Sequence, residues 1–255
     1  MGEFNKATYV SNAGLLLELY DKKILIDGFC NSILPIYKNP PNRLKEKMIL
    51  GVPPFDNIDI LLFTHHHSDH FDSKSTGEFL KNNKNTLVVS TSKVIEEINN
   101  VYCEIEEDRL IIAKPLLYSG EDTYIKGINI QSISMLHQGE EYQDVENLGF
   151  LIEIGGKKVL HVGDAKPIKE NYMELGLTHK NIDLLGVTFP YVGVHTGRQV
   201  IEKYIKPQKI AVIHLPHREL DQYGWIDATR KSYRRVQHSF VETVFLEEIE
   251  ATIEI

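Results

Sequence analysis

The sequence predicts an α/β fold arranged as a four-layer αββα sandwich, to which two similar halves of the chain each contribute a sheet. A β-hairpin pattern occurs twice, 135 positions apart, and each copy is followed by a buried strand, a helix and a further strand. The chain has 255 residues, of which 42% are hydrophobic, enough for a sizeable core. Two sheets that each need cover on both faces pack most simply against one another, with the helices outside.

The first half supplies the pattern. Residues 14–19 and 24–28 are apolar runs on either side of a polar turn, which is typical of a hairpin. Residues 57–64 read as a buried strand. An amphipathic helix that includes residues 76–81 and a short strand over 86–90 follow it.

The second half repeats these elements in the same order. Residues 149–154 and 159–163 predict the second hairpin, residues 181–188 the buried strand, residues 196–201 part of the helix and residues 209–214 the last strand. Chance matching of short apolar runs is the alternative. Because neither half looks self-sufficient, we expect one domain over residues 1–255.

The connection between the first hairpin and the next strand is long and rich in proline. It covers residues 31–54 and contains five prolines, so we expect an irregular segment. It is interpreted either as a mobile cover over a functional site or as a plain surface loop.

Charge and cysteine content narrow the class of protein. The formal charge of −8, from 28 basic and 36 acidic residues, argues against broad attraction to nucleic acid or anionic membranes. No secretory signal pattern and no apolar run of about 18 residues is visible, so we expect a cytoplasmic protein without a membrane span. Cys30 and Cys103 are too few for a disulfide scaffold and are expected to be reduced.

A histidine cluster stands where the strand over 57–64 ends. His65, His67, Asp69 and His70 bring three imidazoles and a carboxylate into one loop, and the imidazoles would repel each other if protonated. A metal ion resolves that conflict, and these ligand types suit zinc, with manganese or iron as alternatives. A purification tag would not be internal and interrupted by an aspartate. His66 alternates away from its neighbours and is expected either to point outward or to contact the ligands from behind.

Four ligands from one short loop cannot all surround a single tetrahedral ion, so two metals are more plausible than one. Further ligands should come from other loops at the same edge of the sandwich. Three residues that follow apolar strands provide them, namely His137, Asp164 and His214.

The set His65-x-His67-x-Asp69-His70 followed by His137, Asp164 and His214 resembles the metallo-β-lactamase superfamily, with its five motifs in order over nearly the whole chain. The first hairpin, Gly163-Asp164 and Ile213-His214 are most similar to the small single-domain hydrolases of that superfamily. Ascorbate-6-phosphate lactonase and the N-acylphosphatidylethanolamine-type phospholipase D belong to this branch. The resemblance implies the superfamily's αββα fold.

The resemblance also implies roles for individual residues. One metal would be held by His65, His67 and His137, and a second by Asp69, His70 and His214, with Asp164 bridging the two. A hydroxide between the metals would attack a small ester, lactone or phosphodiester, and Asp69 would orient it. The positive charge left by two divalent cations favours a small anionic substrate.

Three other functions could use the same fold and related motifs. A nuclease would share the metal motifs, but its only support is the basic run over residues 230–235, which also fits a solvated helix face; nucleic acid is therefore an unlikely partner. A diiron redox enzyme would carry Glu where His67 stands. A non-catalytic binding protein would be expected to lose ligands. Relatives are often oligomeric, so a homo-oligomer is a possible assembly.

Four further residues are candidates for supporting roles. Asp27 ends a strand and would accept the second N–H of a ligating imidazole, unless it is a turn carboxylate. His195 stands in the loop of the second half that corresponds to the first metal-binding loop, and the chain holds Tyr191 and His217 near the metals. All three would contact the substrate, although His195 also fits an exposed loop. His161, His179 and His238 are interpreted as ordinary core or surface residues.

Overall fold

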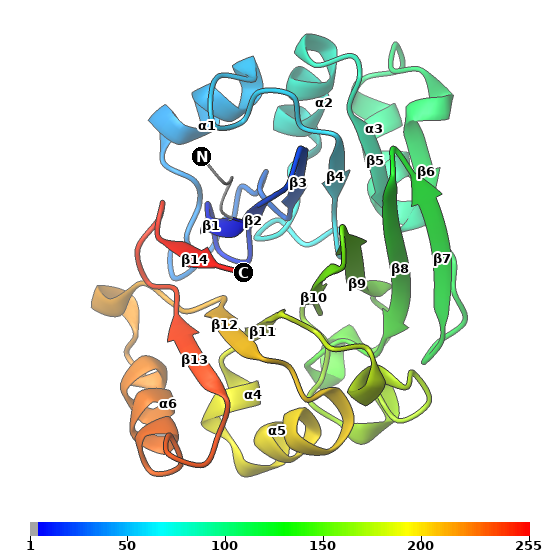
Figure 1. Ribbon diagram of the computed structural model, residues 1–255. Helices are drawn as coiled ribbons and strands as arrows, with labels where there is room; N and C mark the ends of the chain where they lie inside the picture. The colour runs from blue at the N-terminus through cyan, green and yellow to red at the C-terminus, as the bar shows by residue number, and fades with distance from the viewer. Residues whose placement is uncertain (1–4) are drawn as a thin grey trace.

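Two seven-stranded mixed sheets form the centre of the protein, and helices cover their outer sides (Figure 1). The computed structural model describes residues 5–255. The first sheet has the order β14-β1-β2-β3-β4-β5-β6, with bounds Thr252–Glu254, Lys6–Tyr9, Leu15–Leu19, Lys22–Ile26, Ile60–Leu62, Leu87–Ser90 and Leu110–Ile112. The αββα prediction is confirmed.

The second sheet repeats the order of the first. It runs β13-β12-β11-β10-β9-β8-β7, with bounds Glu242–Phe245, Lys209–Ile213, Leu184–Thr188, Lys157–His161, Asn147–Ile154, Ile128–Met135 and Gly120–Ile125. The predicted hairpins are β2–β3 and β9–β10, both antiparallel. In each half the second hairpin strand continues into two parallel neighbours, β4–β5 and β11–β12, so the internal repeat is present in the topology.

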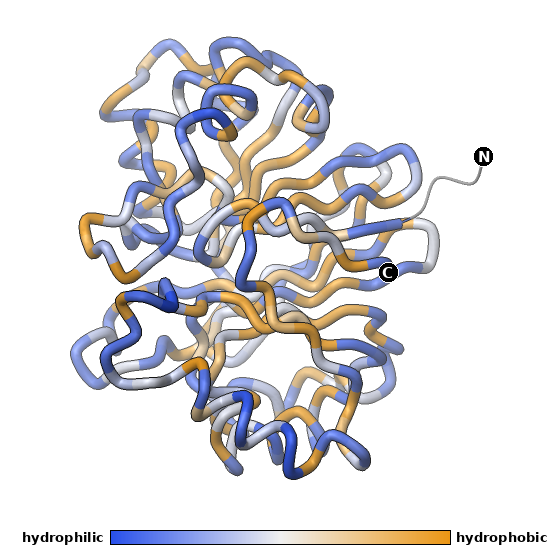
Figure 2. Tube along the Cα trace, turned by 90° about the vertical axis from the view of Figure 1, so that its left-hand side faces the viewer, coloured by the Kyte–Doolittle hydropathy of each residue, from blue (hydrophilic) through white to orange (hydrophobic). Residues whose placement is uncertain are grey.

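Alternating side chains of each strand divide the core into three layers. Leu15 and Leu17 of β2 point between the sheets and pack with Phe150 and Ile152 of β9. Leu16, between them in sequence, points outward under the helices. Figure 2 shows the resulting concentration of hydrophobic residues along the strands, with hydrophilic residues on the outer loops.

Three helices cover each sheet. Over the first lie α1 (Asn42–Leu50), α2 (Ser73–Asn82) and α3 (Ser92–Val101); over the second lie α4 (Pro190–Gly193), α5 (His195–Val200), which continues as a π-helical turn over Ile201–Ile205, and α6 (Trp225–Arg234). Within residues 5–255, no helix is both long enough and apolar enough to cross a membrane.

Helix α1 corrects the expectation that residues 31–54 are irregular throughout. The helix follows Pro41, whose fixed φ suits a helix start, and ends at Gly51 in the left-handed conformation. It buries Leu44 and Met48, which are four residues apart and therefore share one face. The prolines on either side favour a loop, so this short helical pattern of apolar residues was not predicted from the sequence.

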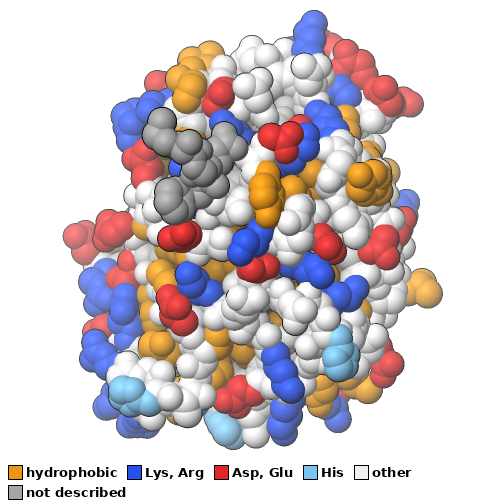
Figure 3. Space-filling view, viewed as in Figure 1, with side chains coloured by type: hydrophobic (Ala, Val, Ile, Leu, Met, Phe, Trp, Pro, Cys, Tyr) orange, Lys and Arg blue, Asp and Glu red, His pale blue; other side chains and the backbone are white. Residues whose placement is uncertain are grey.

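The basic run over residues 230–235 lies in and just after α6, with Lys231, Arg234 and Arg235 exposed. The prediction of a solvated helix face is confirmed. Figure 3 shows Lys and Arg side chains gathered over this part of the molecule with acidic side chains among them.

Candidate metal centre

The predicted ligands follow the ends of β4, β8, β10 and β12, and their side chains converge at one edge of the sandwich. The carboxyl ends of parallel strands meet at the same edge of a sheet, which places the loop after β10 beside the loop after β12. A backbone hydrogen bond links the two halves at this edge: Leu148 N donates to Thr64 O at 2.8 Å. The loop at 65–70 is closed by His70 N, which donates to His67 O at 2.9 Å.

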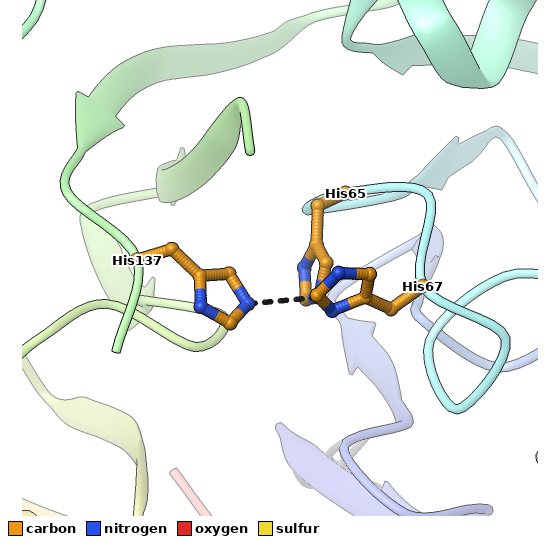
Figure 4. Close-up of side chains that lie close together, drawn as sticks. All are labelled: His65, His67 and His137. Atoms are coloured by element: carbon orange, nitrogen blue, oxygen red, sulfur yellow. Dashed lines mark hydrogen bonds between the residues drawn. The ribbon is translucent and has the colours of Figure 1, made fainter. Parts of the chain in front are cut away.

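Three histidines form the first group of candidate ligands. His65 Nε2 lies 3.1 Å from His67 Nδ1 and 3.4 Å from His137 Nε2. Figure 4 shows the three rings pointing toward one another from two different loops. Nδ1 of His137 lies 2.6 Å from the carbonyl oxygen of Gln138, which fixes Nδ1 as the donor and leaves Nε2 with its lone pair toward the group.

The second group contains Asp69, His70, Asp164 and His214, whose ligand atoms all lie within 4.8 Å of one another. His214 Nε2 lies 3.0 Å from Asp69 Oδ2 and 3.4 Å from Asp164 Oδ2. Asp164 also lies 3.9 Å from His137 Nε2 of the first group. It is therefore the residue placed between the two groups.

Asp27 holds the ring of His70. Its Oδ2 lies 2.8 Å from His70 Nδ1, and the same carboxylate accepts hydrogen bonds from Thr64 N at 2.8 Å and Thr64 Oγ1 at 2.7 Å. Because an ionised carboxylate only accepts, His70 carries its proton on Nδ1 and turns Nε2 toward Asp164. Asp27 has a left-handed backbone, with φ of 44°, which is an uncommon conformation for an aspartate.

Asn12, Asn147 and His161 position the ligands, and sequence reasoning did not assign them this role. Asn12 O accepts from His214 N at 2.8 Å, and Asn12 Nδ2 donates to Asp69 Oδ2 at 3.1 Å. Asn147 Oδ1 accepts from the backbone N–H of Asp164 at 3.0 Å. All three are fully or almost fully buried at the edge where the sheets meet.

His161 links the sheets beneath Asp164. Its Nε2 donates to Ala13 O at 2.9 Å, and its Nδ1 accepts from Gly163 N at 3.2 Å. Burial lowers the pKa of His161, which keeps the ring neutral as both contacts require. The interpretation of His161 as an ordinary core residue therefore omitted a structural role next to Asp164.

The two groups differ in their electrostatics. Burial lowers the pKa of His65 well below its usual value and that of His67 to about 4, so these imidazoles are neutral near pH 7, as metal ligation requires. Burial alone would lower the pKa values of His70 and His214, but the carboxylates of Asp164 and Asp69 outweigh it and raise both.

The donor set fits divalent cations. His70 Nε2 and Asp164 Oδ1 are buried 3.3 Å apart, and among the described residues neither has a hydrogen-bond partner. Such unpaired atoms are costly in a protein interior unless something binds them. Five imidazole nitrogens and two carboxylates are the ligand types that zinc, manganese and iron accept.

A cleft of about 640 Å³ opens over the candidate centre. Seven segments of the described chain line it, namely Ser32, Ile33, Leu34 and Tyr37; His67, Ser68 and Asp69; His137, Gln138, Gly139, Glu141 and Tyr142; Asp164; Thr188, Phe189 and Pro190; His214; and Trp225. Burial, with the nearby carboxylates of Asp69 and Asp164, raises the pKa of Tyr37 to about 12, so its phenol stays protonated at neutral pH.

Part of the segment 31–54 lines the cleft. Asn31 N donates to Ser68 O at 2.7 Å, and Ile36 O accepts from His217 N at 2.9 Å. These contacts hold both ends of the stretch that carries Ile33 and Leu34.

Among the described residues, three predicted site residues do not line the cleft, namely Tyr191, His195 and His217. Tyr191 is fully buried, and its hydroxyl donates to Ala165 O at 2.9 Å, so its side chain supports the Asp164 loop instead of facing a substrate. His195 begins α5 in an exposed position, and His217 is exposed beyond the cleft wall. His66 is half-buried and belongs to neither group of candidate ligands among the described residues; its ring centroid lies 5.3 Å from that of His67.

Comparison with known proteins gives a consistent family. The sequence model described as the beta-lactamase superfamily domain matches residues 6–214. The chain is 25% identical over 216 residues to a UPF0173 metal-dependent hydrolase from Pyrococcus abyssi, covering 82% of this chain and 84% of that protein. It is 21% identical to another from Staphylococcus carnosus over 91% of this chain and 92% of that protein.

Solved structures share the fold. Igni18, a metallo hydrolase from Ignicoccus hospitalis, superposes with a TM-score of 0.67 at 17% identity, over 99% of this chain and 100% of that one. CmlA, a diiron β-hydroxylase from Streptomyces venezuelae, gives a TM-score of 0.66 at 15% identity over 100% of this chain. This chain spans 55% of the longer CmlA chain.

Proposed function

This chain belongs to the beta-lactamase superfamily and is a metal-dependent hydrolase, and on that premise we propose that it cleaves a small ester, lactone or phosphodiester with two divalent cations. His65, His67 and His137 would hold one cation, and Asp69, His70 and His214 the other. The observation that carries the proposal is Asp164, whose carboxylate lies within 4 Å of both His137 and His214 and leaves a buried oxygen unpaired.

Zinc is the proposed metal, with manganese or iron as alternatives, because imidazole and carboxylate ligands suit all three. Bound there, paired cations would lower the pKa of water from 15.7 toward ~7 and polarise the oxygen of the scissile group. They would also attract a substrate that is anionic at that group.

The chain's own residues would position the reactants. Asn12 Nδ2 holds the carboxylate of Asp69 at 3.1 Å, so that Asp69 can accept a hydrogen bond from the attacking water and orient it. Tyr37 lies in the cleft with its ring 4.8 Å from that of His214, edge to face. Its protonated phenol would donate a hydrogen bond to the substrate as negative charge develops on the scissile group.

The cleft does not favour the nuclease alternative. Among its lining residues, all within the described part of the chain, there is no Lys or Arg to contact a phosphate backbone. In α6, Arg230 Nε donates to Glu247 at 2.8 Å, so this member of the basic run is used within the fold.

Replacement of Asp164 by Asn tests the proposal. Turnover of bis(p-nitrophenyl) phosphate and of a panel of lactones by the zinc-loaded protein should be lost, since the amide cannot serve as an anionic bridge. Asp183→Asn is the matched control, because Asp183 is similarly buried (side chain 13% exposed, against 15% for Asp164) and pairs with Lys157 away from the cleft. Turnover retained in Asp164→Asn would contradict the bridging role.

A further inference from the structure

The walls of the cleft point to the part of the substrate that the candidate metals do not touch. We propose that this substrate carries an apolar group, which packs against the part of the cleft lined by Phe189, Pro190 and Trp225 while the scissile bond lies over the metal centre. The placement of the scissile bond rests on the proposed function; the apolar subsite rests on the walls alone.

Three aromatic rings form a continuous stack along one wall. The ring centroids of Phe189 and Trp225 lie 5.5 Å apart with 23° between the planes, and those of Tyr223 and Trp225 lie 5.0 Å apart with 25°. Phe189 follows β11 and Trp225 begins α6, so the stack joins two elements far apart in sequence. Because Trp225 stacks on both of its neighbours, its ring is held in a fixed position at the cleft.

The stack remains accessible at its outer end. Trp225 is 36% exposed and Tyr223 is 66% exposed, whereas large aromatic side chains are usually well buried. Phe189, Pro190 and Trp225 all line the cleft. The exposed part of Trp225 is therefore part of the cleft lining, whereas Tyr223 supports it from outside that lining.

Two aliphatic side chains form another part of the cleft lining. Ile33 is 86% exposed and Leu34 is 53% exposed, and both line the cleft. The hydrogen bonds at Asn31 and Ile36 tie down the backbone on either side of them. Apolar side chains held over a cleft in this way indicate a contact surface for an apolar ligand.

The charges of the cleft agree with an apolar substrate body. Within residues 5–255, the charged side chains that line it are the carboxylates of Asp69, Glu141 and Asp164, with no Lys or Arg. A negative charge on the substrate would therefore be favourable only next to the cations. The remainder of the molecule meets aromatic and aliphatic walls.

A single fluorophore reports on this subsite, because Trp225 is the only tryptophan of the chain. Metal-free protein is titrated with γ-phenyl-γ-butyrolactone, γ-cyclohexyl-γ-butyrolactone and unsubstituted γ-butyrolactone while Trp225 emission is followed. We expect a saturable change with the phenyl and cyclohexyl compounds at about tenfold lower concentration than with the unsubstituted one, because both carry an apolar group. Binding of the unsubstituted lactone as tight as that of the two substituted ones would overturn the proposal.

Matched variants locate the effect. Leu34→Ser should weaken binding of the phenyl lactone several-fold, whereas Leu50→Ser, at a 64% exposed position on α1, should not. Phe189→Leu should weaken it as well, because it removes one ring of the stack. The same affinity in Leu34→Ser, Phe189→Leu and the unmodified protein would exclude the assigned walls.

Kinetics separates this inference from the proposed function. With the zinc-loaded protein, the ratio of kcat/KM for phenyl over unsubstituted lactone should exceed about ten and should fall toward one in Trp225→Leu. A ratio near one in the unmodified protein would overturn the inference while leaving the hydrolase function intact. Failure to hydrolyse either lactone would count against the proposed lactone chemistry, and the fluorescence titration would still decide the subsite.

Discussion

The imidazole of His70 is fixed by Asp27, whose Oδ2 lies 2.8 Å from His70 Nδ1 in a fully buried contact. The carboxylate is itself held by Thr64 through both its backbone N–H and its hydroxyl. The proton is thereby kept on Nδ1, and Nε2 is presented to the second group of candidate ligands. Orientation of a ligating imidazole by a carboxylate raises its basicity and its affinity for metal.

Asp27→Asn should therefore weaken zinc binding about 10–100-fold, because the amide stabilises the imidazole's Nδ1 proton less well. Competition with a chromophoric chelator measures the affinity. Asp59→Asn is the control, since Asp59 also accepts a backbone hydrogen bond, from Lys23 N at 3.1 Å, but lies remote from the cleft. Unchanged zinc affinity in Asp27→Asn would show that the contact has no part in metal binding.

Gly163 is the position where a single methyl group should displace Asp164. Its φ is +56°, and an added Cβ would lie 2.5 Å from Asn147 Oδ1 and 2.7 Å from Thr64 Cβ. Gly176 has nearly the same φ, +61°, with nothing within 4 Å of an added Cβ. Gly176→Ala should cost only the left-handed backbone penalty of about 1–2 kcal/mol in unfolding free energy.

Gly163→Ala should lose more stability than Gly176→Ala, and it should also lose zinc affinity, since Asn147 holds the backbone of Asp164. Urea denaturation and zinc titration of the two variants provide the comparison. Equal losses of stability together with normal zinc affinity would mean that the close packing at Gly163 does not position Asp164.

Tyr37→Phe should lower kcat/KM for a lactone or phosphodiester by at least about tenfold, because a hydrogen bond to the developing charge is lost. Zinc content should not change, as Tyr37 is outside both ligand groups. With a Tyr37 pKa of about 12, the loss should be the same throughout pH 6–9. A kcat/KM equal to that of the unmodified protein would remove Tyr37 from the mechanism.

Glu247 should make the stability of the α6 region depend on pH. Partial burial alone would raise its pKa, but hydrogen bonds from Arg230 and Arg218 outweigh burial and lower it. A lowered folded-state pKa means that the stabilisation is complete above the unfolded-state value of about 4.3 and is lost as pH falls through the folded-state pKa. Glu247→Gln should therefore cost of the order of 1 kcal/mol at pH 7 and less at pH 3.5.

Urea denaturation of the unmodified protein and Glu247→Gln at both pH values measures the difference. Glu242→Gln is a suitable control, because Glu242 is 67% exposed and its ion pair with Lys209, at 4.0 Å, is long and therefore weak. An equal cost of Glu247→Gln at both pH values would show that the ion pairs do not cause it.

The ligand set could be predicted from the sequence because each ligand lies in a loop that follows an apolar strand. Strand ends are marked by the loss of the apolar run, and the carboxyl ends of neighbouring parallel strands meet at one edge. The same logic placed Asp27 at the end of β3, where it meets His70.

The contacts that orient the ligands could not be predicted from the sequence. His161 donates to Ala13, 148 positions away, and this pairing depends on how the two sheets are stacked. Asn12 lies in the bend between β1 and β2, and Asn147 is the first residue of β9; no sequence pattern marks either as a contact of the ligands. Tyr191 is close in sequence to the loop of the second half that carries His195, which suggests that it faces the substrate. Packing instead directs its side chain inward to Tyr172 and Ala165.

The metal content of the protein tests the central claim most directly. Protein stripped with chelator, reloaded with zinc and freed of excess should contain two ions per chain by native mass spectrometry, and Asp164→Asn should contain fewer. The unmodified protein should also unfold at a higher temperature when loaded. A chain that retains no zinc at micromolar concentrations would contradict the account.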